Sequence, residues 1–287
     1  MAQGLKDIRR RIASVKNIRK ITTAMKMVAA AKLRRAQDQA QAGRPYAEAI
    51  RGVLGRLAAN ATAVHPFLVE RPAQRTLVIV VTSDRGLAGA YNSNLNRLAR
   101  RLTQESPGAR VVVVGRKARD FFRRRGVEIA AEYTGLGDQP RFADAEAIGR
   151  EAGRLYLSGE CDRVHLVYAR FLNAITSRPV ATQLLPIAAE HLSEAGAARS
   201  GGEYIFEPDA ETVLEHLLPH YVSVLVYRAL LEAKASEFGA RMAAMDNATE
   251  NAGEVIDRLT LISFRMRQAA ITKEIAEIVG GANALQG

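Results

Sequence analysis

The feature that most constrains this 287-residue chain is a C-terminal stretch with almost no helix breaker. It begins at Asp209, a candidate N-cap ahead of the acidic residues Glu211 and Glu215, and it runs to about Val279 with only Pro219 inside it. About seventy helical residues would form a rod of about 105 Å. Uncharged residues follow one another along it at alternating steps of four and three: Phe238, Met242, Met245, Thr249, Ala252, Ile256, Leu259, Ser263, Met266 and Ala270. This heptad seam, with its several small members, predicts a second helix packed closely along it.

An N-terminal stripe of apolar residues supplies a candidate for that second helix. Its members recur at steps of three or four, the spacing of one face of an amphipathic helix: Leu5, Ile8, Ile12, Val15, Ile18, Ile21, Met25 and Val28. Helical composition continues to about Leu57, with a break expected at residues 43–45, which include Gly43 and Pro45. We expect the two terminal helices to pair antiparallel. The C-terminal helix would then extend past its partner by roughly twenty residues, or about 30 Å, and its end would need another protein around it.

The middle third of the chain has a different period. Short apolar runs with strand character occupy residues 76–81, 110–115, 127–133, 162–171 and 179–187, and helical stretches lie near 93–104, 116–125 and 142–158. This alternation predicts a small open α/β sheet with crossover helices, and residues 193–203 have the composition of a linker. The sequence therefore predicts an α/β fold in three parts: an N-terminal coiled-coil helix (1–60), a Rossmann-like α/β domain (70–195) and a C-terminal coiled-coil helix (207–287).

Positive charge is concentrated near the N-terminus. The formal net charge is +11, and residues 1–60 contain 14 Lys and Arg against 3 Asp and Glu, while the other 227 residues carry 27 of each sign. A local excess of this kind suggests an acidic partner, a nucleic acid or a lipid surface. The single cysteine, Cys161, excludes an intrachain disulfide and fits a reducing compartment. No apolar run reaches the length of a membrane span.

Few residues suggest catalysis or ligand binding. The segment VTSDRGLAGAYN, residues 81–92, joins a predicted strand to a predicted helix, so Gly86 and Gly89 either form a tight turn or approach a nucleotide. It reads G-x-x-G rather than G-x-G-x-x-G, and the chain contains no GxxxxGK[ST], HExxH or GxSxG motif. His216 and His220 lie four residues apart and would bind a metal only with a third ligand from elsewhere. We expect no catalytic residue, cofactor or metal in this chain.

Four segments resemble the gamma subunits of F-type ATP synthases, in the same order along the chain. They are IRRRIASVKNIRKITTAMKMVAAAKLRRAQ (8–37), SDRGLAGAYN (83–92), RMAAMDNATENAGE (241–254) and RQAAITKEIAEIVGGANAL (267–285). Each segment is long and specific, and together they span both ends of the chain. One small departure is Ala88, where many relatives have cysteine.

The resemblance implies a non-catalytic rotor subunit of a proton-translocating ATP synthase. In that family the terminal helices form a shaft inside a ring of three alpha and three beta subunits, and the α/β domain binds epsilon and the membrane ring of c subunits. Rotation then couples ion flow through the c-ring to conformational change at the catalytic alpha and beta subunits. The protein would be peripheral, on the cytoplasmic side of a bacterial plasma membrane, with membrane contact only through the c-ring.

The same resemblance implies particular contacts between rotor and stator. Acidic segments of the beta subunits would meet the shaft near Met25. Arg267 and Gln268 match residues that in the family hydrogen-bond a loop of the beta subunit, and Thr272 and Glu274 match polar positions nearby. No nucleic acid and no cofactor is implied.

Two other classes of protein would explain parts of the sequence. A basic coiled-coil nucleic-acid-binding protein would use the arginines at residues 9–11 and 34–35, but it gives no reason for an uncharged C-terminal tip. A dinucleotide-dependent enzyme would explain the α/β domain alone.

Overall fold

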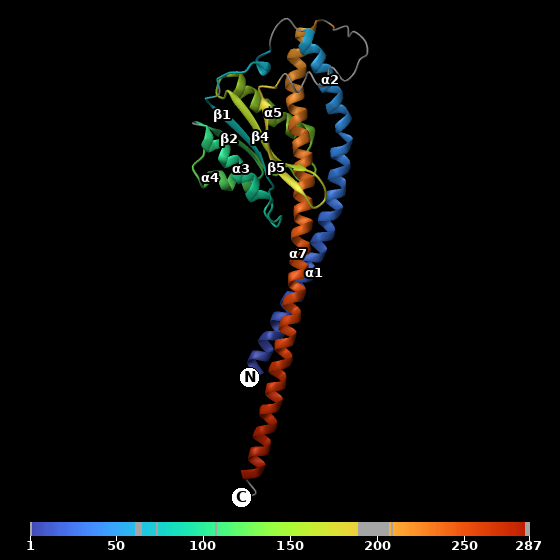
Figure 1. Ribbon diagram of the computed structural model, residues 1–287, viewed down its shortest axis with the longest axis vertical. Helices are drawn as coiled ribbons and strands as arrows, with labels where there is room; N and C mark the ends of the chain where they lie inside the picture. Colours follow the sequence, from blue (N-terminus) through green and yellow to red (C-terminus); the bar gives the residue numbers. More distant parts are fainter. Residues whose placement is uncertain are drawn as a thin grey trace. The chain divides into compact units, whose positions relative to one another are not determined.

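Long helices stand at both ends of the chain (Figure 1). The computed structural model describes residues 2–60, 65–72, 74–106, 108–188, 207 and 209–284, so the expected linker at 193–203 lies outside the described residues. Helix α1 (Ala2–Ala42) is followed by α2 (Arg44–Asn60), which confirms the predicted break. Pro45 stands in the first turn of α2, where its missing N–H removes no helical hydrogen bond. A short 3₁₀ helix, η1, covers Pro66–Leu68.

Helix α7 (Ala210–Ala284) is a single helix of 75 residues. Asp209 caps it as predicted, because its Oδ1 accepts a hydrogen bond of 2.7 Å from the backbone N–H of Thr212. The expected end near Val279 was wrong, since the helix continues through Gly280 and Gly281. Each glycine lowers helix stability by about 1 kcal/mol relative to alanine, but it leaves the backbone hydrogen bonds intact.

A five-stranded sheet with the order β3-β2-β1-β4-β5 lies between these helices in the sequence. Its strands are β1 (Thr76–Val81), β2 (Arg110–Val114), β3 (Ile129–Tyr133), β4 (Arg163–Phe171) and β5 (Ser177–Leu185). The first four are parallel, and β5 runs antiparallel to β4. All residues of the central strand β1 are buried, as expected for a parallel sheet covered on both faces. The predicted α/β sheet is thus confirmed.

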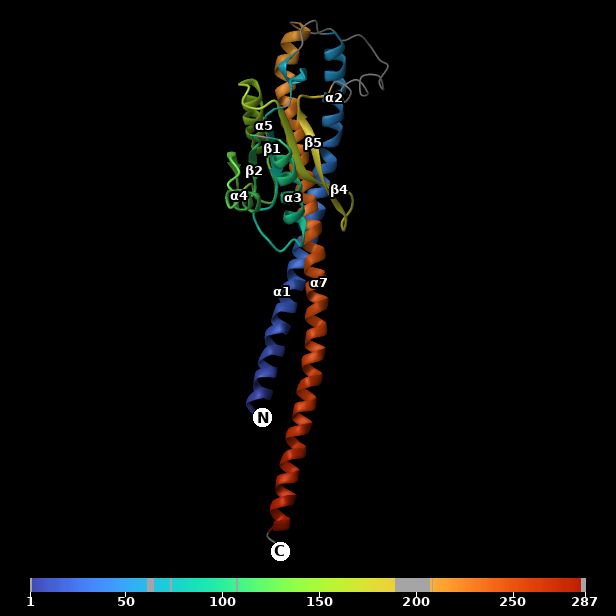
Figure 2. The same cartoon turned by 60° about the vertical axis from the view of Figure 1, so that its left-hand side comes forward.

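Helices cover both faces of this sheet (Figure 2). Helices α3 (Tyr91–Glu105) and α4 (Arg116–Arg123) pack against one face, in a core that includes Val78, Val80, Leu95 and Phe122. Helix α5 (Phe142–Leu157), α2 and the first part of α7 share the core of the other face, which includes Ile79, Leu54, Tyr156 and Leu230. Alternate residues of β1 point into the two cores, following the two-residue period of a strand.

The chain divides into two compact units, Met1–Val28 with Met242–Gly287, and Ala29–Arg241. Within the first unit, α1 and α7 run antiparallel: Lys26 Nζ lies 2.5 Å from Asp246 Oδ1, and Thr249 Oγ1 donates to Thr22 Oγ1 over 2.7 Å. The antiparallel pairing is therefore confirmed. All residues of the α7 seam are buried or half-buried. Nearer the start of α1, Gly4 faces Met266, so the part of α7 beyond that level is about 27 Å long.

The apolar stripe predicted on α1 is only partly correct. Residues 5–15 of the stripe are half-buried, but Ile18, Ile21 and Val28 are 49%, 59% and 53% exposed. The cause is the pair of three-residue steps after Val15, which places Ile21 about 120° around the helix from it. Thr22 returns to within about 20° of Val15, and it is buried in place of Ile21.

Candidate functional site

In an open α/β sheet, a ligand usually binds at the carboxyl ends of the strands, where the strand order reverses. In this sheet that point lies between β1 and β4, and residues 83–90 follow β1 there. Beside this point, at the ends of β1 and β2, a cavity of about 20 Å³ is lined by Tyr91 and by the α7 residues Leu230, Lys234 and Glu237. Such a cavity has room for about one water molecule. Helix α7 therefore packs closely over the ends of β1 and β2.

The segment after β1 is held as a turn by its own polar groups. Ser83 donates its N–H to Asn92 Oδ1 over 3.0 Å, and the carboxylate of Asp84 accepts the N–H groups of Arg116 and Gly135, each at 3.0 Å. Positive φ angles occur at Leu87 (62°) and Gly89 (53°). Gly89 therefore has the left-handed backbone conformation that favours glycine, and the other such residue in the turn is Leu87 and not Gly86.

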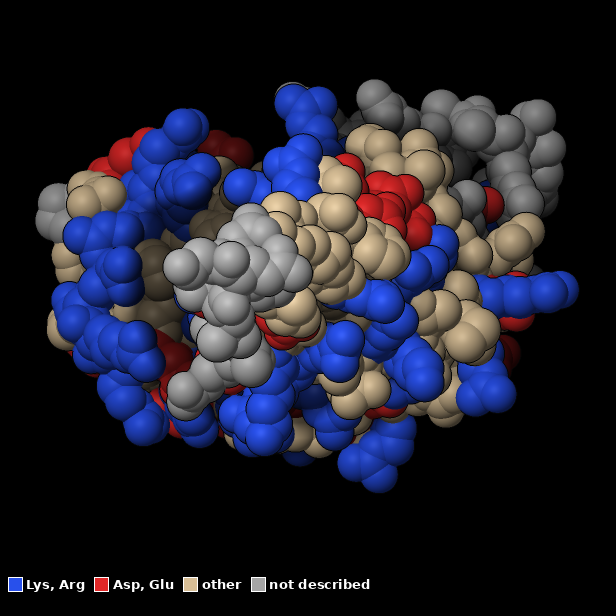
Figure 3. All heavy atoms as spheres, turned by 90° about the horizontal axis from the view of Figure 1, so that it is seen from below, with Lys and Arg blue, Asp and Glu red and all other residues tan. Residues whose placement is uncertain are grey.

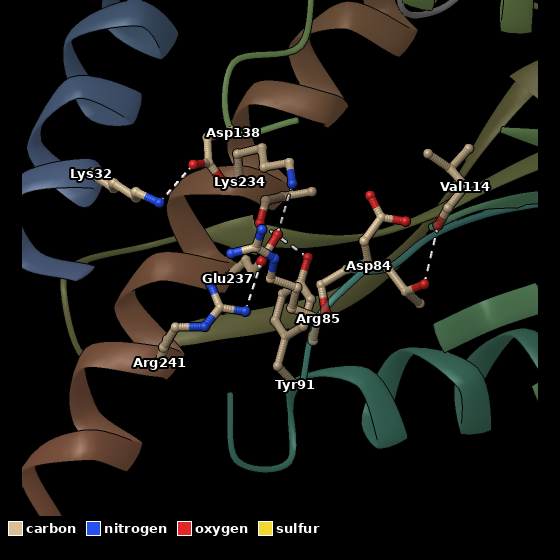
Figure 4. A network of polar contacts seen from close by, with 12 residues as sticks. Lys32, Asp84, Arg85, Tyr91, Val114, Asp138, Lys234, Glu237 and Arg241 are labelled. Carbon is tan, nitrogen blue, oxygen red and sulfur yellow. Dashed lines mark hydrogen bonds and ion pairs between the residues drawn. The ribbon is translucent and has the colours of Figure 1, made fainter. Parts of the chain in front are cut away.

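Charged side chains of α7 face this turn (Figure 4). Glu237 pairs with Lys234 and with Arg241, and Arg241 also donates to the backbone oxygen of Gly86. The buried Tyr91 hydroxyl donates to the backbone oxygen of Ala233 over 3.0 Å. Burial raises the pKa of Tyr91 well above its usual value, the charge of Glu237 adds to the rise, and Arg241 opposes it. The phenol therefore stays a neutral hydrogen-bond donor at physiological pH.

The residues predicted to contact a stator lie at two levels of the paired helices. Arg267, Gln268, Thr272 and Glu274 are exposed on α7, and the Thr272 hydroxyl bonds back to the Gln268 carbonyl oxygen at 2.9 Å. Met25 is half-buried on α1, at the level of the Lys26–Asp246 pair. Since that pair lies some twenty α7 residues from Arg267, the two levels are about 30 Å apart. The structure brings the four α7 residues together but not Met25.

Large apolar side chains surround the α7 group, and they are exposed. Their exposed fractions reach 62% at Phe264 and 71% at Ile278, and the set comprises Leu261, Phe264, Ile271, Ile275, Ile278 and Val279. Phe264 and Ile271 line a shallow hollow of about 440 Å³ with Arg265, Arg267 and Gln268. A concentration of exposed apolar surface marks a binding surface in many proteins. The sequence analysis did not identify Leu261, Phe264 and Ile271 as surface residues. The available signal was their position, because each lies off the heptad seam.

A second group of positive charges lies within residues 61–287, the part of the chain whose total charge is zero. Residues 91–126, which contain α3 and α4, carry 10 Lys and Arg against 2 Asp and Glu. A count over 227 residues hid this local excess. On the face seen in Figure 3, Lys and Arg side chains far outnumber Asp and Glu.

The remaining candidates for chemistry have structural partners. His216 Nδ1 lies 2.9 Å from the Thr212 carbonyl oxygen, and His220 Nε2 lies 2.8 Å from the Tyr46 hydroxyl. Among the described residues, no group of three metal-binding side chains occurs. Cys161 is buried, and burial raises the pKa of its thiol to about 12, which leaves it unreactive. Within the described ranges, no helix is long and apolar enough to cross a membrane.

Comparison with known proteins gives consistent matches over nearly the whole chain. A family model described as ATP synthase matches residues 4–285. The ATP synthase gamma chain of Desulfitobacterium hafniense is 54% identical over 283 residues, covering 98% of this chain and 99% of that protein. The ATP synthase gamma chain of Moorella thermoacetica is 52% identical over 284 residues, with the same coverage.

Solved structures show the same fold. A chain of the Tetrahymena thermophila mitochondrial ATP synthase central stalk and c-ring matches with a TM-score of 0.60 at 27% identity, covering 79% of this chain and 99% of that one. A chain of the Euglena gracilis mitochondrial ATP synthase matches with a TM-score of 0.73 at 21% identity, covering 99% of this chain and 95% of that one. At that identity, the second likeness supports the fold alone.

Proposed function

The chain belongs to the ATP synthase gamma family and is the rotor subunit of the central stalk, and from this premise we propose that it couples proton flow through a c-ring to conformational change at catalytic alpha and beta subunits. The gamma chain is not itself the catalytic subunit. Its proposed partners are an alpha-beta ring, epsilon and the c-ring, at the cytoplasmic side of a bacterial plasma membrane. The bacterial relatives at about half identity support this location.

The main observation behind this proposal is that the paired helices expose large apolar side chains on their surface. On α1, Ile18, Ile21 and Val28 are about half exposed, and on α7 the residues from Leu261 to Val279 add a second apolar surface. Moving a large apolar side chain from water into a contact contributes about 1.5–3 kcal/mol before ordering costs. A ring of subunits around the helices would remove this surface from water.

The polar contacts proposed for the rotor stand beside this apolar surface. Arg267, Gln268, Thr272 and Glu274 lie on the exposed part of α7, where they are free to meet a stator loop. Near Met25, Lys20 is exposed, whereas Lys26 is held by Asp246 in the same unit. We therefore assign the attraction for an acidic beta-subunit segment mainly to lysines such as Lys20, and the packing to Met25 and its apolar neighbours.

Coupling follows from the different faces of the helix pair. A rotor that presents an apolar strip to one catalytic subunit and charged side chains to another favours a different conformation of each, and so a different nucleotide affinity. Rotation then exchanges the three states. No bond is made or broken on the gamma chain itself.

Cysteine labelling tests the proposed contacts. In a Cys161→Ser background, single cysteines would replace Ile21, Phe264 or Arg267, and the control would replace Leu157, which is 53% exposed on α5. We expect assembly with alpha and beta subunits to slow maleimide labelling at the three positions by about tenfold or more, with no change at the control. Equal labelling of free and assembled chain at Phe264 and Arg267 would contradict the assignment.

A further inference from the structure

One polar network holds the turn after β1 against α7, within the unit Ala29–Arg241 (Figure 4). Its central group is the carboxylate of Glu237, and each of its oxygens meets one cation. Oε2 lies 3.0 Å from Lys234 Nζ, and Oε1 lies 2.8 Å from a terminal nitrogen of Arg241. The side chains of Lys234, Glu237 and Arg241 are only 15%, 6% and 12% exposed. Three charges are thus withdrawn from water together.

Two hydrogen bonds carry this network across to the turn. The guanidinium of Arg241 that pairs with Glu237 also donates to the backbone oxygen of Gly86 over 3.2 Å. Tyr91 donates its hydroxyl to the backbone oxygen of Ala233, which lies about one helical turn before Glu237 on α7. The chain after β1 is therefore fixed to α7 at two points, Gly86 within the turn and Tyr91 just after it, and loss of either bond would leave a buried charge or a buried hydroxyl without its partner.

The β4–β5 hairpin approaches the same part of α7. Ser236 donates its hydroxyl to the Ala169 carbonyl oxygen over 3.0 Å. A Cβ added to Gly239 would lie 2.6 Å from the Ala174 carbonyl oxygen, so the backbone of the hairpin comes directly against the helix there. These contacts hold the helix from another side of its circumference, which leaves little freedom for it to turn about its own axis.

Apolar contacts alone would not fix that rotation, because they are non-directional. Hydrogen bonds and buried ion pairs require defined geometry, and breaking one partner leaves the other charge uncompensated. We propose that Glu237 is a positioning residue for torque transfer: it holds Arg241 in the conformation that clamps Gly86, and so fixes the rotational position of α7 against the α/β domain. This inference rests on the rotor function, since a shaft must turn with the domain that drives it.

Glu237→Gln is the test, because it keeps the shape of the side chain and removes its charge. Glu232→Gln is the matched control: Glu232 is also a buried acid paired with an arginine on α7, but its partner is Arg228 and not the arginine that bonds Gly86. Hydrogen exchange on the full chain would follow the amides of residues 85–89. We expect exchange there to rise by about tenfold or more in Glu237→Gln, with no rise in the control and recovery in Glu237→Asp.

The second measurement uses the ATP synthase complex reconstituted in vesicles. We expect Glu237→Gln to pump fewer protons per ATP hydrolysed while its hydrolysis rate is retained, and the control to match the wild-type chain. Should Glu237→Gln fail to fold, Arg241→Gln keeps the Lys234–Glu237 pair and removes only the clamp, with the same expected results. Wild-type exchange at residues 85–89, or faster exchange with unchanged pumping per ATP, would overturn the proposal. A wild-type chain that restores no coupled turnover would instead count against the rotor function.

Discussion

At the scale of single residues, buried polar groups stabilise the α/β domain through hydrogen bonds of defined geometry. Asp162 precedes β4, and its side chain is 9% exposed. Its carboxylate accepts hydrogen bonds from the guanidinium of Arg75 and from the backbone N–H groups of Arg75 and Gln74. Burial by itself raises the pKa of Asp162, but these bonds outweigh burial, and the pKa lies below its usual value. The ionised form is therefore the one that stabilises the fold.

Replacing Asp162 by Asn should accordingly have a pH-dependent effect. Because the folded-state pKa is the lower one, the stabilisation is present above the unfolded value near pH 3.9 and is lost as the pH falls through the folded value. We expect Asp162→Asn to lower the free energy of unfolding by about 1–3 kcal/mol at pH 7, with a smaller difference at pH 3. Urea denaturation at both pH values measures this. A loss of the same size at pH 3 would show that the charge is not responsible.

A glycine after β2 has a stricter requirement. Gly115 has a φ of 92°, and a Cβ added there would lie 2.4 Å from the Thr82 carbonyl oxygen. That oxygen belongs to backbone and cannot move aside as a flexible side chain could. We expect Gly115→Ala to lower the free energy of unfolding by about 2–4 kcal/mol, from backbone strain and the displaced strand end. Gly108→Ala is the control for strain alone, because it has a positive φ and no neighbour within 4 Å. If both variants lost the same free energy of unfolding, the contact with the Thr82 carbonyl oxygen would not be the cause.

At the scale of elements, local periodicity sufficed wherever one pattern ran unbroken. All strands were predicted within two residues of their bounds, because apolar runs such as 76–81 need no tertiary information. The outward turn of Ile18 and Ile21 was missed, although the consecutive three-residue steps contained the signal. The filling of the strand ends by Leu230 and Glu237 could not be predicted, because it depends on where a helix from the far end of the sequence packs.

The end of α7 offers a test at this scale. Gly280 and Gly281 lie within the helix, and a Cβ on either would meet nothing within 4 Å. Alanine at both positions should therefore strengthen the helix by about 1 kcal/mol per site, through propensity alone. We expect amide exchange at residues 275–284 of the free chain to slow severalfold in the double variant. Circular dichroism should show a higher helix content in the double variant. Unchanged amide exchange would mean that residues 275–284 are not helical in the free chain.

At the scale of the whole molecule, the proposed function gives the exposed end of α7 two separable roles: to fit inside a ring of subunits and to contact a stator loop that responds to rotation. The seam residues Met266 and Ala270 are half-buried, whereas Arg267 and Gln268 between them are exposed. Truncating the two exposed side chains should therefore leave the helix pair intact. If they hydrogen-bond a stator loop, their loss removes interactions of about 1.5–3 kcal/mol for a charged group, which is a tenfold or greater effect on the step they support.

We therefore expect Arg267→Ala with Gln268→Ala to assemble normally and to synthesise ATP about tenfold more slowly or worse. Arg258→Ala is the control, since Arg258 is also exposed on α7 but lies outside the predicted contact group. Subunit composition after gel filtration reports assembly, and synthesis and hydrolysis rates in the reconstituted complex report coupling. If the double variant assembled normally and synthesised ATP at the full rate, Arg267 and Gln268 would not be the residues that contact the stator loop. Failed assembly would instead assign them to holding the shaft, because a group that only signals to a moving loop is not needed to seat the rotor in its ring.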